Sequence, residues 1–449
     1  MAFKITASFL EKLIGLINEN KDSEIKKLFS EIHYADVAEV LEEVSFDEAI
    51  YIIKLLDSEK TSEILTELDD DIREIILENL SAKEIAEEVE EMDSDDAADI
   101  IGELSEERQE RVISALEDDE LVADIKELLS YEENSAGALM AKELVKVYET
   151  WTVAGCLRRI RAQAKEVTRV HSIYVVDREE KLIGRLSLKD LIVAKNEQKI
   201  SEIYIDKVDV VNVNEEEEVA KIMAKYDLEA IPVVDNRNVL LGRITIDDIV
   251  DVLKEEADKD YQLAAGLTQD VDSDDSILEL TRARLPWLFL GLIGGIGAFL
   301  IMEGFEDAFK GGAFVLFFFT PLIAAMAGNV GVQSSAIIVQ GLANDDVKGS
   351  INSRLIKEML LAALNGVILA LFLFVFVWIT KGDIQTALAI SVSLVVVIIV
   401  AGLIGTFVPL FLNKRGIDPA IATGPFITTS NDIFGILIYF MIAKFILGI

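Results

Sequence analysis

Short amphipathic segments fill the first part of the chain. In the stretch ADVAEVLEEVSFDEAIYIIKLLDSEKTSEILTEL, apolar side chains recur every three or four positions, and polar breaks follow about every dozen residues. At two such breaks, Ser45 with Glu48 and Ser81 with Glu84 have the spacing of a helix-capping box. No proline occurs in this region. We therefore predict that residues 1–130 form an all-α N-domain in which short helices stack as a superhelix.

After the N-domain the pattern changes, and an internal repeat appears. The segment IYVVDREEKLIGRLSLKDLI (173–192) recurs 58 residues later as IPVVDNRNVLLGRITIDDIV (231–250), and eight of the 20 aligned positions are identical. Each copy predicts a strand, a turn that begins at an aspartate, a second strand through Gly184 or Gly242, and a helix. Residues 131–253 are therefore predicted to form an α/β domain built from two similar halves.

The repeat resembles a tandem pair of cystathionine-β-synthase (CBS) motifs. In that family, a Ser or Thr followed three positions later by Asp at the helix start can hold the ribose of an adenine nucleotide. The matching residues here are Ser187 with Asp190 and Thr245 with Asp248. Ser187 and Thr245 can equally serve as ordinary helix N-caps. The resemblance implies ATP as a ligand of this domain, and capping is the alternative.

Hydropathy rises sharply after an acidic segment, residues 254–280, that we predict to be a connecting helix and linker. Five stretches then follow that are free of charged residues, except for Asp432 in the last: 285–302, 311–344, 359–380, 384–413 and 419–443. Each is long enough to cross about 30 Å of hydrocarbon as a helix. We therefore predict a transmembrane domain at 281–449 with five helices, at about 285–302, 313–340, 357–380, 385–412 and 420–446.

Basic residues beside these spans indicate how they cross the membrane, because Lys and Arg are enriched on the cytoplasmic side. With residue 281 in the cytoplasm, seven basic residues fall inside: Arg282, Arg284, Lys348, Arg354, Lys357, Lys414 and Arg415. Three fall outside: Lys310, Lys381 and Lys444. We predict a multi-pass protein of the cell (inner or plasma) membrane, with its N-terminal domains in the cytoplasm and its C-terminus outside.

Charge divides the chain at the same place as hydropathy. The whole chain has a net charge of −38, although 51% of its residues are hydrophobic. Residues 281–449 contain 10 Lys and Arg and 9 Asp and Glu, a net charge of +1, which leaves −39 for the first 280 residues. Such an acidic half repels nucleic acid and attracts cations. The alternative is that its charge only favours solubility.

One carboxylate, Asp432, lies within an otherwise apolar stretch, GPFITTSNDIFGILIYF. At the centre of a membrane span such a charge costs roughly 2.5–3.5 kcal/mol. The nearest basic residue along that span, Lys444, is twelve residues or about 18 Å away. A carboxylate that lacks a fixed counter-charge implies a mobile one, so Asp432 is our candidate for a cation site.

Glycines and polar residues also interrupt the first two spans. In the second span, TPLIAAMAGNVGVQSS, Gly328 and Gly331 let another backbone approach closely or let the helix unwind. Asn329 lies between them and is either a cation ligand or a partner in an interhelical hydrogen bond. In the first span, Gly291 and Gly295 predict close helix packing.

The candidate ligands in the membrane are all oxygen atoms. They are the Asp432 carboxylate, the side chains of Asn329 and Thr428, and the backbone carbonyls near Gly328 and Thr428. No His or Cys occurs in any predicted span, which argues against zinc or copper and for a hard cation. Mg²⁺ retains much of its water and is usually held by one or two carboxylates. One aspartate per chain, doubled by a two-fold axis, suits a hydrated divalent ion, and Ca²⁺, Mn²⁺ and Na⁺ are the alternatives.

The domain order and four motifs resemble the MgtE family of magnesium channels over nearly the whole chain. The motifs are RLPWL at the first span, PLIAAMAGNVGVQS in the second, KRGIDPA before the fifth and PFITTSNDIFG within it. The resemblance implies a homodimer joined through its CBS and transmembrane domains, with a pore for hydrated Mg²⁺. By match to the family, the pore would be lined by Asp432, Gly328, Asn329 and Thr428. Ala327 and Val332 depart from the family pattern, in which many members have Gly and Asn at these positions.

The same resemblance implies that the acidic half senses Mg²⁺ and closes the pore when the ion binds. By match to the family, the sensor residues would be Asp95, Asp99, Asp227, Asp248, Asp251, Glu256 and Asp418. The sequence itself supports this for Asp95 and Asp99, which lie four positions apart on one helix face and repel each other without a cation. Solvated surface carboxylates are the alternative, and they must account for most of the 71 acids in this half.

We therefore predict a Mg²⁺-selective channel that imports magnesium and is gated shut by Mg²⁺ on its cytosolic domains, and not an enzyme. One alternative is a CBS-regulated, cation-coupled secondary transporter of divalent cations. Another is a cytosolic module that binds adenine nucleotides, with transport secondary. An intramembrane aspartyl hydrolase would need two membrane carboxylates that share a proton, and Asp432 is the only such candidate that we identify in the spans.

Overall fold

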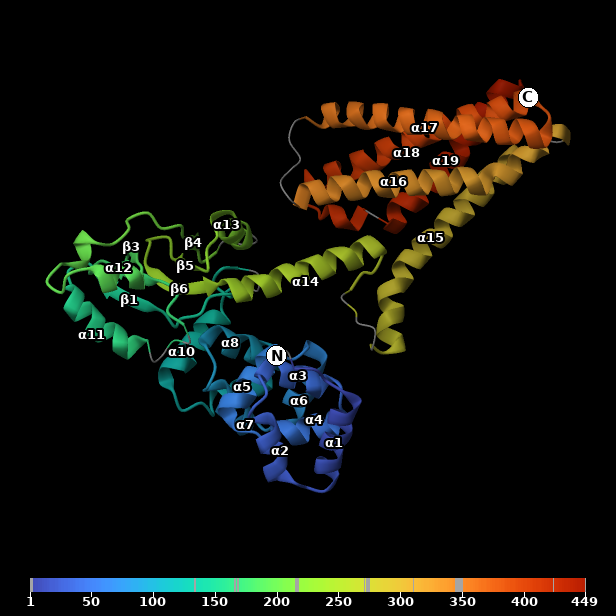
Figure 1. The fold of residues 1–449 in the computed structure, drawn as a ribbon. Helices are drawn as coiled ribbons and strands as arrows, with labels where there is room; N and C mark the ends of the chain where they lie inside the picture. The colour runs from blue at the N-terminus through green and yellow to red at the C-terminus, as the bar shows by residue number, and fades with distance from the viewer. Residues whose placement is uncertain are drawn as a thin grey trace. The chain divides into compact units, whose positions relative to one another are not determined.

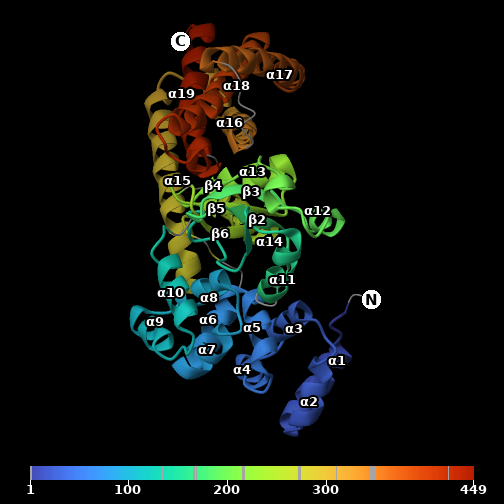
Figure 2. The same ribbon diagram turned by 90° about the vertical axis from the view of Figure 1, so that its left-hand side faces the viewer.

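The protein forms two compact units, Met1–Leu253 and Lys254–Ile449, each described by itself. A computed structural model describes residues 3–132, 135–164, 167, 169–214, 218–269, 271, 275–309, 311–343, 350–422 and 424–448. Figures 1 and 2 show the elements in two views. The predicted fold class is confirmed: helices come first, an α/β region follows, and long apolar helices form the C-terminal part.

The N-domain consists of short helices, as predicted. Within residues 3–132 they are α1 (Ala7–Asn18), α2 (Asp22–Phe29), α3 (Tyr34–Glu42), α4 (Phe46–Ile53), α5 (Ser58–Glu67), α6 (Asp70–Asn79), α7 (Ala82–Val89), α8 (Ser94–Gly102), α9 (Glu106–Ile113) and α10 (Asp119–Leu128). Both capping boxes are present, because the backbone N–H of Ser45 donates to Glu48 at 3.0 Å and that of Ser81 donates to Glu84 at 2.7 Å. The inner faces of α1 to α10 share one apolar core.

The repeat forms two similar three-stranded sheets. Their strands are β1 (Val145–Tyr148), β2 (Ile173–Val176), β3 (Leu182–Leu186), β4 (Val211–Asn212), β5 (Ala230–Val234) and β6 (Leu240–Thr245). In the orders β1-β2-β3 and β4-β5-β6, the first pair of strands is parallel and the second is antiparallel. The helices of this region are α11 (Val153–Gln163), α12 (Leu188–Val193), the 3₁₀ helix η1 (Ile200–Glu202), α13 (Glu218–Tyr226) and α14 (Ile246–Ala265).

The turns and glycines of the repeat have the predicted roles. Asp177 and Asp235 each use one carboxylate oxygen to accept two backbone N–H groups of the turn that they begin. Gly184 and Gly242 lie in the second strand of each half, where an added Cβ would come within 2.6 Å of a neighbouring backbone carbonyl oxygen. Each glycine therefore lets another segment pack directly on the sheet.

Five helices of the second unit are long and apolar enough to span a membrane. They are α15 (Ile277–Phe305), α16 (Thr320–Ala343, after the 3₁₀ helix η2, Gly311–Phe319), α17 (Ile351–Lys381), α18 (Ile384–Asn413) and α19 (Gly424–Leu447, after η3, Pro419–Ala422). Helix α18 contacts α16, α17 and α19, and α15 contacts α19 (Figure 1). The buried helix α18 is thus the centre of the bundle.

Helix α16 is continuous, which decides between the two predicted roles of its glycines. Gly328 and Gly331 lie inside an unbroken helix, so they permit close approach and do not unwind the backbone. An ideal Cβ at Gly405 of α18 would lie only 2.3 Å from the carbonyl oxygen of Gly331. The two helices therefore meet backbone to backbone.

The predicted packing role of Gly291 and Gly295 is wrong. An added Cβ at either glycine would meet no atom of the described residues within 4 Å. The packed glycines of α15 are instead Gly294 and Gly297, and a Cβ at Gly294 would lie 2.2 Å from the Thr429 side chain of α19. The Gly-x-x-x-Gly spacing identified the right helix but the wrong face.

We expect Gly405→Ala to destabilise the helix bundle by about 1–3 kcal/mol, because the new methyl group would meet a backbone carbonyl that cannot turn away. Gly291→Ala is the matched control, since its methyl group enters open space. Thermal unfolding of both purified variants in detergent measures the difference. Equal midpoints for Gly405→Ala and the wild type would contradict the close contact.

Candidate functional site

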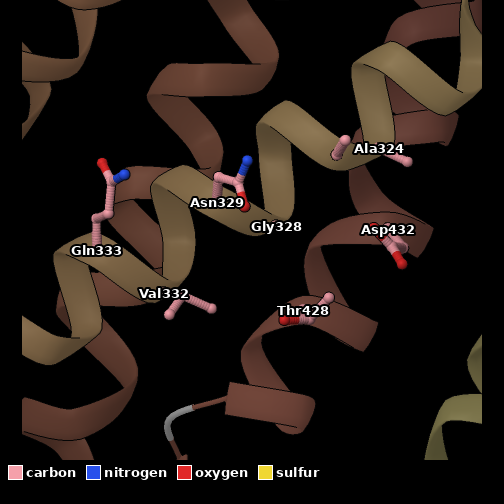
Figure 3. Close-up of a pocket in the computed structure, with 8 residues that line it drawn as sticks. Ala324, Gly328, Asn329, Val332, Gln333, Thr428 and Asp432 are labelled. Carbon is pink, nitrogen blue, oxygen red and sulfur yellow. The ribbon is translucent and has the colours of Figure 1, made fainter.

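A cavity of about 450 Å³ lies between α16 and α19 in the membrane unit (Figure 3). It is lined by Ala324, Ala325, Gly328, Asn329, Val332, Gln333, Thr428 and Asp432. The structure therefore brings together all four residues that the sequence predicted for the pore. They come from two helices that are about a hundred positions apart in the chain.

Asp432 is the carboxylate of this cavity. Its side chain is partly buried, and none of the described residues that line the cavity with it is basic. One turn earlier on α19, the Thr428 hydroxyl donates to the carbonyl oxygen of Gly424 at 2.9 Å, which leaves the lone pairs of the hydroxyl oxygen free to accept. The site thus offers oxygen ligands and a negative charge, which are what a hard cation requires.

A polar contact behind the cavity holds α16 and α19 together. Asn431 is 1% exposed, and its side-chain N–H donates to the carbonyl oxygen of Ala327 at 3.3 Å. Gly331 makes room for it, because a Cβ there would overlap the Asn431 amide. From the sequence, Asn431 is one of the polar residues of the fifth span, and we assigned it no role in the site, although its place next to Asp432 was a usable signal.

A second carboxylate lies in the helix bundle, so Asp432 is not the only one, contrary to the sequence prediction. Glu358 on α17 accepts a hydrogen bond from the Ser334 hydroxyl of α16 at 2.6 Å. Glu358 is absent from the residues that line the cavity of Asp432. The two carboxylates therefore do not form the proton-sharing pair that an aspartyl hydrolase requires.

A separate acidic cluster, which we call the α8 cluster, lies at the start of α8 in the first unit. Asp93, Asp95 and Glu143 each offer a carboxylate oxygen within 4.8 Å of the others. Ser94 donates its hydroxyl to Glu143 at 2.8 Å and accepts the backbone N–H of Lys142 at 2.9 Å. The cluster thus joins the N-domain to the CBS domain, and its ligand type again suits a hard cation.

Arg243 is the basic residue that contacts the α8 cluster. Its side chain is 6% exposed, and its Nε donates to the backbone carbonyl of Glu143 at 2.5 Å. Its terminal nitrogen lies 3.5 Å from the Asp93 carboxylate. One fixed positive charge faces at least three carboxylates, so negative charge remains in excess.

Burial and mutual repulsion raise the pKa values of this region. Burial, and then the charges of Asp96 and Asp248, hold the pKa of Asp95 well above its ordinary value. Burial and then the charge of Asp248 raise the pKa of Asp96 to about 7. Burial and Glu143 raise that of Asp93 to about 6, against the lowering effect of Arg243. The ionised cluster is therefore disfavoured until protons or cations neutralise it.

The predicted sensor residues differ in their burial and in their neighbours. Asp95 and Asp248 belong to the surroundings of the α8 cluster, and Asp99 is exposed one turn along α8. Asp251 lies near Glu67, whose pKa is raised by burial and by that charge. The remaining predicted residues are exposed: Asp227 follows α13 in the first unit, and Glu256 and Asp418 belong to the second unit. Asp93, Asp96 and Glu143 are site residues that we did not identify from the sequence.

Both Ser/Thr-x-x-Asp pairs of the CBS domain are internally hydrogen-bonded. The Ser187 hydroxyl donates to Asp190 at 2.7 Å and accepts the backbone N–H of that residue at 3.1 Å. The Thr245 hydroxyl and backbone N–H both donate to Asp248, at 2.6 and 3.0 Å. The geometry is that of helix capping, and Asp248 also faces the α8 cluster.

The fold and these sites define a class: a multi-pass membrane protein that has an oxygen-lined site between two spans and a CBS regulatory domain. The family models agree with this class. They match a divalent cation transporter domain (MgtE) at residues 320–442, an MgtE intracellular N domain at 32–134, and CBS domains at 136–197 and 201–255. The chain belongs to the MgtE family.

Known relatives cover most of the chain. The protein named magnesium transporter MgtE from Bacillus subtilis is 35% identical over 321 residues, which are 71% of each chain. The protein of the same name from Enterococcus faecalis is 37% identical over 327 residues, 72% of each chain. A solved structure is also similar: the crystal structure of the cytosolic domain of the Mg²⁺ channel MgtE in complex with ATP. The match covers 54% of this chain and 99% of that one, with 34% sequence identity and a TM-score of 0.52.

We expect divalent-cation binding at the α8 cluster to weaken as the pH falls from 8 to 6. Because the pKa values are raised, a cation must displace protons at the lower pH; one carboxyl with a pKa of about 7 accounts for about a tenfold loss of affinity. Calorimetric Mg²⁺ titration of the full chain, in an Asp432→Asn background that removes the membrane carboxylate, measures both affinity and proton release. Equal affinity at both pH values would contradict this account of the cluster.

Proposed function

We propose that the protein is a Mg²⁺-selective channel that imports magnesium and is closed by Mg²⁺ bound to its cytosolic domains. The observation that supports it most is Asp432, a carboxylate on a cavity between two membrane helices. None of the described residues that line this cavity is basic. A charge in such a place needs a partner. The relatives named magnesium transporters support Mg²⁺ as that partner.

Recognition of the ion would act through its water shell. Mg²⁺ gives up water reluctantly, so a wide site with few direct ligands suits it better than a closed cage. Asp432 would supply the charge, and Thr428, Asn329 and the backbone at Gly328 would accept or orient the coordinated waters. A cation that sheds its water easily, such as Na⁺, gains less from this arrangement.

The functional form would be a homodimer with two Asp432 side chains on its axis. One chain contributes a single carboxylate to the cavity, whereas two carboxylates balance a divalent charge. The CBS domain also has an apolar surface available for a second copy, since Leu188, Ile192 and Val193 are exposed on and beside α12. In the membrane, each chain would be oriented so that its N-terminal domains lie in the cytoplasm and its C-terminus lies outside.

Gating would couple the acidic sites to the pore through α14. Each bound cation stabilises the arrangement that brings carboxylates together, by its difference in affinity for the two states. Within the second unit, the end of α14 touches the start of α19, because a Cβ at Gly266 would lie 2.4 Å from Pro425 and one at Gly424 would lie 2.3 Å from the Ala264 carbonyl oxygen. Movement of α14 therefore reaches the helix that holds Asp432.

ATP would be a further ligand of the CBS domain. A relative of 34% identity is described in complex with ATP. In this chain, the pair Ser187 with Asp190 caps its helix, and we assign it no part in the α8 cluster. The Asp190 carboxylate accepts one hydrogen bond from Ser187, whereas that of Asp248 accepts two from Thr245. We therefore propose the first CBS motif as the ribose site.

Replacing Asp432 tests the pore. We expect Asp432→Asn to lower Mg²⁺ flux into liposomes, and the preference for Mg²⁺ over Na⁺, by about tenfold or more, because a neutral amide no longer attracts a divalent ion. Glu303→Gln, which removes an exposed carboxylate at the end of α15, should leave both unchanged. An unchanged preference in Asp432→Asn would refute the pore assignment, and flux that follows a proton gradient would favour a coupled transporter.

Neutralising α8 tests the sensor. We expect the double variant Asp95→Asn, Asp99→Asn to stay open at millimolar cytosolic Mg²⁺, because it removes two of the charges that need the cation. The matched control is Glu106→Gln with Glu110→Gln, an exposed pair with the same four-residue spacing on the next helix, α9. Patch-clamp current against cytosolic Mg²⁺ measures closure. Normal closure of the α8 variant would remove these residues from the sensor.

A further inference from the structure

Glu358 lies where three membrane helices meet. It is the eighth residue of α17, and its carboxylate accepts the hydroxyl of Ser334 on α16 at 2.6 Å. On its other side, an ideal Cβ at Gly402 of α18 would lie 3.0 Å from the same carboxylate oxygen. Gly402 therefore leaves the space that Glu358 occupies.

Glu358 lies at the start of the apolar part of α17, and its side chain is partly buried. Neighbouring positions on α17, such as Leu360 and Leu361, present exposed apolar side chains, as expected of a helix that faces lipid. Among the ion pairs between described residues, none includes Glu358. Because its partner in the structure is the neutral hydroxyl of Ser334, the residue is placed to hold a helix and not to balance a charge.

The contacts that fix α16 lie on the side away from the cavity. They are made by Ala327, Gly331 and Ser334, which have the i, i+4, i+7 spacing of one helix face. The cavity side is formed by residues such as Asn329 and Gln333. Two of the three rear contacts involve the backbone of α16, at Ala327 and Gly331. Among the hydrogen bonds given for the described residues, that of Ser334 to Glu358 joins α16 to another helix through two side chains.

We propose that Glu358 is a positioning residue for the pore helix: by accepting the Ser334 hydroxyl, it sets the rotation of α16 that presents Asn329 and Gln333 to the cavity. The link to conduction rests on the proposed function, whereas the link to helix rotation does not. Glu358 is not among the described residues that line the cavity, and it acts through Ser334. A Cβ at Gly402 would lie 3.0 Å from this carboxylate oxygen, so a larger residue there would crowd the Glu358 side chain.

Cysteine labelling tests the rotation directly. Cys156 is the only cysteine, so Cys156→Ser gives a background for one new thiol, Asn329→Cys, that faces the cavity. The readout is the rate at which a small cationic methanethiosulfonate reagent modifies this thiol in full-length protein in liposomes. We expect Glu358→Ala and Ser334→Ala each to slow modification by about tenfold, the factor that corresponds to one lost hydrogen bond to a charged group.

Three further variants separate positioning from general damage. Glu358→Gln keeps an acceptor oxygen and should restore the wild-type rate. Glu358→Ala combined with Ser334→Ala should be no slower than either alone, because both remove the same bond. Met359→Ala, at the exposed neighbouring position, should have no effect. Folding is checked by a monodisperse elution profile, and if Glu358→Ala fails this check, Ser334→Ala provides the test.

The outcomes also separate this inference from the proposed channel function. Wild-type labelling rates in Ser334→Ala and in folded Glu358→Ala would overturn the positioning role, whatever the Mg²⁺ flux. Slowed labelling that Glu358→Gln restores would support it, even if the wild type conducts no Mg²⁺. In the second case, the absent flux would count against the channel and not against Glu358.

Discussion

Negative charge without enough fixed positive charge is the constraint on which both halves of this protein depend. In the membrane unit, Asp432 faces a cavity whose lining, as far as the structure describes it, contains no basic side chain. In the first unit, one arginine, Arg243, faces the carboxylates of the α8 cluster, and their pKa values are raised by burial and mutual repulsion. Both arrangements are unfavourable until a cation arrives. One kind of mobile ion can therefore be the cargo of the membrane site and the signal at the cytosolic site.

Glycines, which have no side chain, let the membrane helices pack closely enough to form the membrane site. Gly331 and Gly405 bring α16 and α18 into backbone contact, and Gly294 of α15 leaves room for the Thr429 side chain of α19. Such small residues replace the hydrophobic driving force that helices lack in lipid. Polar contacts then set the rotation of α16, through Asn431 on one neighbour and Glu358 on another. The cavity is thus a consequence of how the rear of α16 is packed.

Much of this could be predicted from the sequence, for reasons that are local. Capping boxes at Ser45 and Ser81, the aspartate turns of the repeat and the long apolar spans each depend on residues close in the chain. What could not be predicted depends on tertiary contacts. The Gly-x-x-x-Gly spacing led us to predict that Gly291 packs against another helix, although no atom of the described residues lies within 4 Å of an added Cβ at this position. Glu143 and Arg243 are remote from α8 in sequence, and Glu358 lies one residue before an uncharged stretch, so none of them was identified.

The central claim is that the counter-charge of Asp432 is a hydrated, mobile divalent ion. An electron cryomicroscopy map of the full-length protein in lipid nanodiscs with Mg²⁺, compared with one in chelator, tests it most directly. The account predicts a two-fold assembly in which two Asp432 carboxylates flank density for an ion with its water shell, and this density is lost in chelator. Asp432 side chains that face lipid, or that contact a basic residue with no water path beside them, would contradict the account.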